Sequence, residues 1–135
     1  MLLVDTNVLL DVVTNDPIWA DWSQRQLEKL AFQYRLAVNP VVYAELSIGF
    51  QRIAEVETVL DEIRVEVEEI PRPALFLAGK AFGAYRARGG TKTGVLPDFF
   101  IGAHAVVAGI ALLTRDARRY RAYFPSITLI TPGDA

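Results

Sequence analysis

The sequence has no cysteine among its 135 residues, and it has a single histidine. Disulfides and thiolate metal sites are therefore excluded, and a zinc site is disfavoured because a second histidine is missing. A long hydrophobic run is also lacking, since the longest late apolar stretch, residues 101–113, is shorter than the ~20 residues that span a bilayer. These absences fit a reducing compartment, and we expect a cytoplasmic protein without a membrane partner.

The sequence also lacks a large net charge, because its 14 Lys and Arg residues nearly balance its 16 Asp and Glu residues and leave a net charge of −2. No global basic field points to nucleic acid. The charges are nevertheless clustered, with five acids in residues 61–69 and four arginines in residues 115–121. A local basic group can bind phosphate, although solvation of the surface is the ordinary role of a charged side chain.

The bulk composition indicates a folded chain. Hydrophobic residues make up 52% of the sequence, with only 7 prolines and 9 glycines. A length of 135 residues suits one domain, 1–135, with its own core. No basic segment accompanies the short apolar run at the N-terminus, so we expect no signal peptide.

Short apolar runs alternate with helical patterns along the chain. Strands are expected at residues 2–5, 36–38, 110–114 and 126–131, and residues 65–67 either end a helix or form a further strand. Helices are expected at residues 6–13, 18–35, 41–52, 55–66, 74–88, 98–108 and 116–123. This alternation predicts an α/β fold with a mainly parallel sheet. Residues 41–94 are nearly all helical in pattern, which predicts a helical arm in the middle of the chain.

Four acidic residues lie in apolar surroundings, where an isolated carboxylate is costly. They are Asp5, Glu45, Asp98 and Asp116. Two follow expected strands and two lie near helix starts, so a parallel sheet would bring them to one edge. Four oxygen ligands suit Mg²⁺ or Mn²⁺, which can activate water and neutralise the charge of a scissile phosphate. The four together therefore favour a metal site.

Each acid also has an ordinary structural explanation when it is taken alone. Asp5 can be a turn residue, and Glu45 can pair with an arginine. Asp98 can complement the dipole of its helix, and Asp116 can cap the helix that follows it. His104, the single histidine, lies off the face of Asp98, so we expect it to pack or to be at the surface.

Three segments carry a family resemblance: LLVDTNVLLD at residues 2–11, AEL around Glu45, and LPDFFIGAHAVVAGIALLTRD at residues 96–116. The chain resembles the PIN-domain ribonucleases, and specifically the VapC-type toxins of toxin–antitoxin pairs. The first and third segments are fairly specific, whereas AEL alone is weak.

The resemblance implies a three-layer α/β/α fold with a central parallel sheet of about five strands. It also implies Mg²⁺- or Mn²⁺-dependent cleavage of RNA, a homodimer, and inhibition by a cognate antitoxin protein. The residues that match the acidic positions of the family are Asp5, Glu45, Asp98 and Asp116. Thr6 and Asn7 match supporting positions, and many relatives carry another polar residue in place of Asp116. The candidate contacts to RNA phosphates are Arg86, Arg88, Arg115 and Arg118.

Two other functions fit the same residues. One is a nuclease that processes RNA or DNA in housekeeping, and the other is a non-catalytic module of the same fold whose acidic groove binds a protein. Growth arrest on expression would separate a toxin from a binding module. An antitoxin reading frame beside the gene would separate a toxin from a housekeeping nuclease.

Overall fold

The computed structural model describes residues 1–92 and 94–133 of the chain. Its strands are β1 (Leu2–Val4), β2 (Leu36–Val38), β3 (Val65–Val67), β4 (Ala111–Leu113) and β5 (Leu129–Ile130). They form one sheet in the order β3-β2-β1-β4-β5, and every neighbouring pair is parallel. The inner strands are apolar and buried, as expected for a parallel sheet that is covered on both faces.

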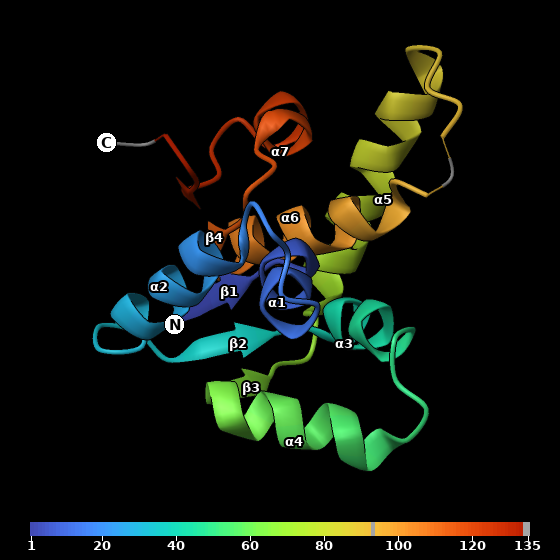
Figure 1. Cartoon of the computed structure of the whole chain (residues 1–135). Coiled ribbons are helices and arrows are strands. Elements are labelled where there is room, and N and C mark those ends of the chain that lie inside the picture. The colour runs from blue at the N-terminus through green and yellow to red at the C-terminus, as the bar shows by residue number, and fades with distance from the viewer. Residues whose placement is uncertain (93, 134–135) are drawn as a thin grey trace.

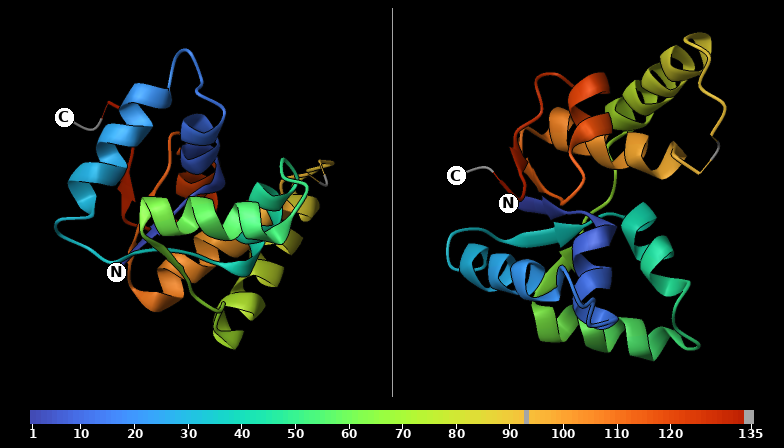
Figure 2. Two further views of the ribbon diagram at one scale, coloured as in Figure 1. Left: turned by 60° about the horizontal axis from the view of Figure 1, so that its bottom comes forward. Right: turned by 45° about the horizontal axis from the view of Figure 1, so that its top comes forward.

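Helices cover both faces of this sheet. They are α1 (Thr6–Val13), α2 (Ala20–Leu30), α3 (Pro40–Ser47), α4 (Ile53–Ile63), α5 (Arg72–Ala87), α6 (Leu96–Ala108) and α7 (Arg118–Tyr123). Figure 1 and the right view of Figure 2 show α1, α2 and α4 on one side and α5, α6 and α7 on the other. Helix α3 contacts both α1 and α6. The predicted three-layer α/β/α fold is therefore confirmed.

Several element boundaries differ from the prediction. The expected helix at residues 18–35 ends at Leu30, and the one at 41–52 ends at Ser47, because turns follow both. The last helix begins at Arg118, so residues 114–117 form a loop after β4. Residues 65–67 form a strand that pairs with β2. The middle of the chain is thus helical apart from β3, and the end of α5 stands out from the body (Figure 1).

The start of α3 shows how local chemistry sets an element. Asn39 follows β2 and is buried, and its side-chain oxygen accepts hydrogen bonds from the backbone N–H groups of Val41 and Val42, both at 3.0 Å. Pro40 occupies the first helical position, where no N–H is needed. This cap turns the chain directly from β2 into the helix that carries Glu45.

The order of the strands defines where a ligand can bind. Strand β1 is central; β2 and β3 are added on one side of it, and β4 and β5 on the other. The order therefore reverses between β1 and β4, and open α/β sheets bind ligands in the crevice at the carboxyl ends of the strands at such a point. The backbone N–H of Asp5 donates to the carbonyl of Leu113 over 2.9 Å, so the two strand ends remain paired up to the crevice.

Helices α5, α6 and α7 are joined by an aromatic cluster formed by Phe82, Tyr85, Phe99, Tyr123 and Phe124. Gly102 on α6 permits this packing, since a Cβ atom there would lie 2.5 Å from the ring of Phe124. The close approach thus brings α7 down onto α6. Among the described residues, no helix combines the length and hydrophobicity needed to cross a membrane.

Candidate active site

Asp5 lies at the carboxyl end of β1, and only 4% of it is exposed. Its Oδ1 accepts a hydrogen bond from the backbone N–H of Thr6 at 2.7 Å, which caps α1. Its Oδ2 accepts hydrogen bonds from the hydroxyl groups of Thr114 and Tyr120, both at 2.8 Å. The carboxylate is therefore fixed by donors from α1, from the loop after β4 and from α7.

Burial dominates the electrostatics of this carboxylate. It raises the pKa of Asp5 from 3.8 to about 6, and the charge of Asp98 acts in the same direction, while the hydrogen bonds from Thr114 and Tyr120 lower it. Burial, and then the charge of Asp5, raises the pKa of Tyr120 well above its ordinary value. Tyr120 therefore stays a neutral hydrogen-bond donor, and Asp5 is a carboxylate that lacks a full counter-charge.

Thr6 and Asn7 connect Asp5 to its surroundings. The Thr6 hydroxyl donates to Oε1 of Glu45 over 2.7 Å, which ties α1 to α3. The Asn7 amide donates to the Thr114 hydroxyl over 3.2 Å and lies 3.4 Å from Oδ2 of Asp5. Glu45 thus contacts a hydroxyl group rather than the arginine that its structural explanation required. Both Thr6 and Asn7 lie where supporting residues are expected.

Asp98 lies in the first turn of α6 and forms an ion pair with Arg119 of α7. Burial raises the pKa of the Asp98 carboxyl, and the charges of Glu45 and Asp116 act in the same direction, whereas Arg119 opposes them. Asp98 is therefore within electrostatic reach of Asp5, Glu45 and Asp116. The gathering of all four carboxylates into one metal site stays a prediction.

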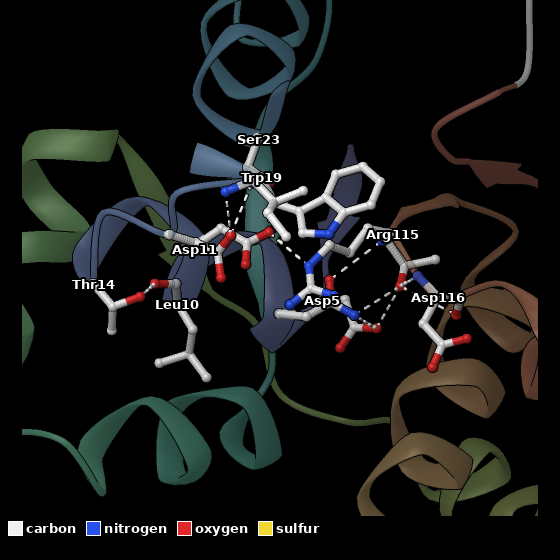
Figure 3. A network of polar contacts seen from close by, with 12 residues as sticks. Asp5, Leu10, Asp11, Thr14, Trp19, Ser23, Arg115 and Asp116 are labelled. Atoms are coloured by element: carbon white, nitrogen blue, oxygen red, sulfur yellow. Dashed lines mark hydrogen bonds and ion pairs between the residues drawn. The ribbon is translucent and has the colours of Figure 1, made fainter. Parts of the chain in front are cut away.

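Asp116 is exposed on the loop after β4. Its backbone N–H donates to the Thr114 hydroxyl over 3.1 Å, and the same hydroxyl donates to Asp5. The residue at the cap position of α7 is Ala117, and no side chain caps this helix, so Asp116 does not have the capping role that its structural explanation required. Figure 3 shows Asp116 beside Asp5 at this end of the sheet.

The side chain of Arg115 extends from the loop after β4 to Asp11 of α1 (Figure 3). Its Nε donates to Asp11 over 2.8 Å, and its guanidinium lies 5.6 Å from the ring centroid of Trp19. Asp11 is only 2% exposed and also accepts a hydrogen bond from Ser23 at 2.8 Å. A charge-assisted bond to a buried acid holds its partners firmly. The loop that presents Thr114 and Asp116 is therefore attached to α1 and α2.

The four acids offer the kind of ligand that a divalent cation needs. All four acids offer oxygen ligands, as Mg²⁺ and Mn²⁺ prefer, and the uncompensated burial of Asp5 favours a nearby cation. In residues 1–92 and 94–133, however, no group of three Asp, Glu, His or Cys side chains is close enough to hold an ion, and Arg119 is bound to Asp98. The oxygen ligands fit the chemistry of the cation, and the side chains must move for three of them to contact one ion.

The remaining candidate residues lie around this edge or behind it. Arg118 is exposed and lines a hollow of about 400 Å³ together with Asp116 and Arg119. Arg86 and Arg88 are exposed at the end of α5, and Arg88 lies over the ring of Tyr123 at 5.7 Å.

His104 is buried, so of the two environments expected for it, packed or at the surface, the packed one is found. Its Nδ1 lies 3.3 Å from the side-chain nitrogen of Asn39. That nitrogen can only donate, so Nδ1 accepts the hydrogen bond and the neutral ring carries its proton on Nε2. Burial lowers the pKa of His104, in keeping with a neutral packing role. The Asn39–His104 contact links the strand end before α3 to α6.

Thr114, Tyr120 and Asp11 were not identified from the sequence. Asp11 carries the signal that identified the four acids, because it lies in an apolar segment, VLLDVV, and is buried. Thr114 directly precedes the Arg-Asp pair at a strand end. Tyr120 gives no sequence signal, since an aromatic residue on a short helix ordinarily belongs to the core.

Comparisons with known proteins agree with this geometry. The chain matches the PIN domain family over residues 2–125. No curated protein sequence gives a match. Among solved structures it is similar to VapBC2 from Rickettsia felis bound to a DNA fragment from its promoter, with 21% identity, a TM-score of 0.73, and coverage of 96% of this chain and 97% of that chain.

Two further solved structures align with 100% of this chain and with 100% of their own chains. A toxin–antitoxin complex from Klebsiella pneumoniae has 20% identity and a TM-score of 0.70. FitAcB from Neisseria gonorrhoeae has 18% identity and a TM-score of 0.69. The family match spans nearly the whole chain, and the structures share its fold. The chain belongs to the PIN domain family.

Proposed function

We propose that this chain is a metal-dependent endoribonuclease and the toxin of a toxin–antitoxin pair. The observation that carries the proposal is Asp5, a buried carboxylate at the carboxyl end of the central strand. The charge of Asp98 acts on Asp5, and the charges of Glu45 and Asp116 act on Asp98. Membership of the PIN family and the likeness to a toxin–antitoxin complex support it. We further propose that residues 1–135 act as one nuclease domain in the cytoplasm.

In this proposal Asp5, Glu45, Asp98 and Asp116 hold Mg²⁺ or Mn²⁺. The bound cation supplies positive charge for the scissile phosphate and makes the attacking water more acidic. Thr6 and Thr114 keep the carboxylates in place through their hydrogen bonds. Tyr120, held neutral by burial, covers the inner side of Asp5 and excludes water from it.

The substrate assignment rests on the distribution of charge around the acids. Arg118 borders the hollow beside Asp116, Arg88 lies over Tyr123 of α7, and Arg86 is exposed on α5, so we propose that a single strand of RNA contacts them through its phosphates. Arg115 is held by Asp11, which gives it a positioning role, and its contact with RNA stays a prediction.

The partner assignment rests on an apolar groove between α2 and α4. It has a volume of about 500 Å³ and is lined in part by Val12, Leu27 and Ile63. Beside it Phe32 is 92% exposed, which is unusual for so large an apolar side chain. A groove of this kind accepts the apolar face of a helix, and we propose that a segment of the antitoxin binds there. Homodimerisation is part of the same proposal.

A cleavage assay of the purified chain tests the enzymatic part. We expect the wild type to cut single-stranded RNA in the presence of Mg²⁺ or Mn²⁺ and to leave it intact in EDTA. The Asp5→Asn variant should leave the RNA intact although its circular dichroism spectrum matches that of the wild type. Cleavage by Asp5→Asn at the wild-type rate would show that the site is wrongly assigned. Growth arrest on expression of the wild type, relieved by Asp5→Asn, tests the toxin part, and unaffected growth would favour a binding module.

A further inference from the structure

Arg119 is the cation that contacts the acid cluster in the described part of the chain. Its guanidinium pairs with Oδ2 of Asp98, and the two side chains are 29% and 30% exposed. The negative charges of Glu45 and Asp116 also act on the Asp98 carboxyl and raise its pKa. The guanidinium therefore provides positive charge at a point where several negative charges meet, as a bound cation would.

The position of Arg119 follows from the way α7 is anchored. The next residue, Tyr120, is 2% exposed and donates its hydroxyl hydrogen to Asp5. Gly102 allows Phe124, at the end of the same helix, to pack directly against α6. With both ends of α7 fixed on α6 and β1, Arg119 is presented to Asp98 by buried contacts.

Two other arginines of this region are placed differently. Arg115 bonds to Asp11 of α1. Arg118 is exposed and forms no ion pair among the described residues, although it lies next to Arg119 on the same helix. The contact with Asp98 therefore distinguishes Arg119 from Arg115 and Arg118.

We infer that Arg119 is the internal counter-cation of the metal-free site and competes with the divalent cation for Asp98. A guanidinium and a divalent ion repel each other, and they compete for the lone pairs of the same carboxylate. Arg119 thus stabilises the folded chain before metal is bound, and it is displaced from Oδ2 of Asp98 when a cation takes that oxygen. This inference rests on the proposed metal dependence, and it adds that affinity for the cation is set partly by Arg119.

Direct Mn²⁺ binding to the full-length chain tests the competition, with free Mn²⁺ measured by electron paramagnetic resonance. We expect Arg119→Gln to bind Mn²⁺ about tenfold more tightly than the wild type, which corresponds to about 1.4 kcal/mol. Arg25→Gln is the control, because it removes the same charge from an exposed position on α2, away from the four acids, and we expect its dissociation constant to stay within about twofold of the wild type. Without metal, Arg119→Gln should melt at a lower temperature than the wild type, and saturating Mn²⁺ should remove the difference.

The wild type offers a second measurement that needs no variant. In a Mg²⁺ titration followed by nuclear magnetic resonance, the side-chain Nε–H signal of Arg119 should shift with the midpoint of binding, while that of Arg115 stays. An unchanged Arg119 signal during saturable binding, or equal Mn²⁺ affinity of Arg119→Gln and the wild type, would overturn the inference and leave the proposed function intact. Absence of any Mn²⁺ binding by the wild type would instead refute the proposed metal dependence, and the inference with it.

Discussion

Replacing Asp5 by Asn should stabilise the metal-free protein, although it abolishes the proposed activity. The carboxylate is buried, and its pKa is raised from 3.8 to about 6. Since one pKa unit corresponds to about 1.36 kcal/mol, keeping this group charged in the folded state costs about 3 kcal/mol above pH 6. The neutral amide avoids this cost. It keeps an acceptor for the N–H of Thr6, and the Tyr120 hydroxyl can rotate to accept from its nitrogen. The Thr114 hydroxyl cannot, because it already accepts from Asn7 and from the N–H of Asp116, and this offsets part of the gain.

The sign of the pH dependence follows from linkage. Because the folded-state pKa is raised, the folded chain binds the proton more tightly than the unfolded chain, and the free energy of unfolding falls as pH rises from about 4 to about 6. The penalty persists above that range. The Asp5→Asn variant should therefore gain about 2 kcal/mol relative to the wild type between pH 4.5 and pH 8.

Urea denaturation in EDTA at these two pH values measures the effect. The difference between variant and wild type isolates Asp5, because the other titrating groups are common to both proteins. Asp61→Asn, at an exposed position on α4, is the control for the removal of a carboxylate that is in contact with water. A difference between Asp5→Asn and the wild type that is the same at both pH values would refute the argument that the Asp5 carboxylate is buried without sufficient compensation.

Three further substitutions test the packing around the site. Gly102→Ala should cost about 1–3 kcal/mol in thermal or urea unfolding, because its Cβ would meet an aromatic ring at 2.5 Å, whereas Gly83→Ala on α5, with open space around it, should be neutral or stabilising. Equal effects of the two would contradict the close packing of α6 and α7. Arg115→Ala should cost about 2–4 kcal/mol because it leaves a buried acid unpaired, and adding Asp11→Asn should recover part of the loss. No recovery would mean that the ion pair is not the cause. Tyr120→Phe should raise the pKa of the carboxylate at the end of β1, as followed by carbon-13 resonance, and an unchanged titration would remove the hydroxyl from the account.

Much of the framework was predictable because its signals are local. The apolar run before Asp5 and the Asn39-Pro40 cap each report a strand end or a helix start through neighbouring residues alone. The gathering of the four acids is predicted on a similar ground, since parallel strands with helical crossovers place their carboxyl ends at one edge. Only the assumption of a parallel sheet was required, and the structure confirms that sheet.

The partners of the acids were not predictable, because they depend on where α7 begins. The expected helix started at residue 116, whereas α7 starts at Arg118 and leaves a loop that is tied down by Arg115. Successive residues of a helix point about 100° apart, so the orientation of α7 on the body decides which arginine faces the acids. Consequently Arg119, which pairs with Asp98, could not be told apart from Arg118 in the sequence.

A crystal structure of the chain soaked in MnCl₂, with the anomalous signal of manganese recorded, tests the central claim most directly. We predict an anomalous peak for a manganese ion at the carboxyl end of β1, bound to carboxylate oxygens of Asp5, Glu45, Asp98 and Asp116. Arg119 should be displaced from Asp98. A peak located elsewhere, or no peak at this edge when manganese is saturating, would contradict the assignment of these acids as a metal-dependent nuclease centre.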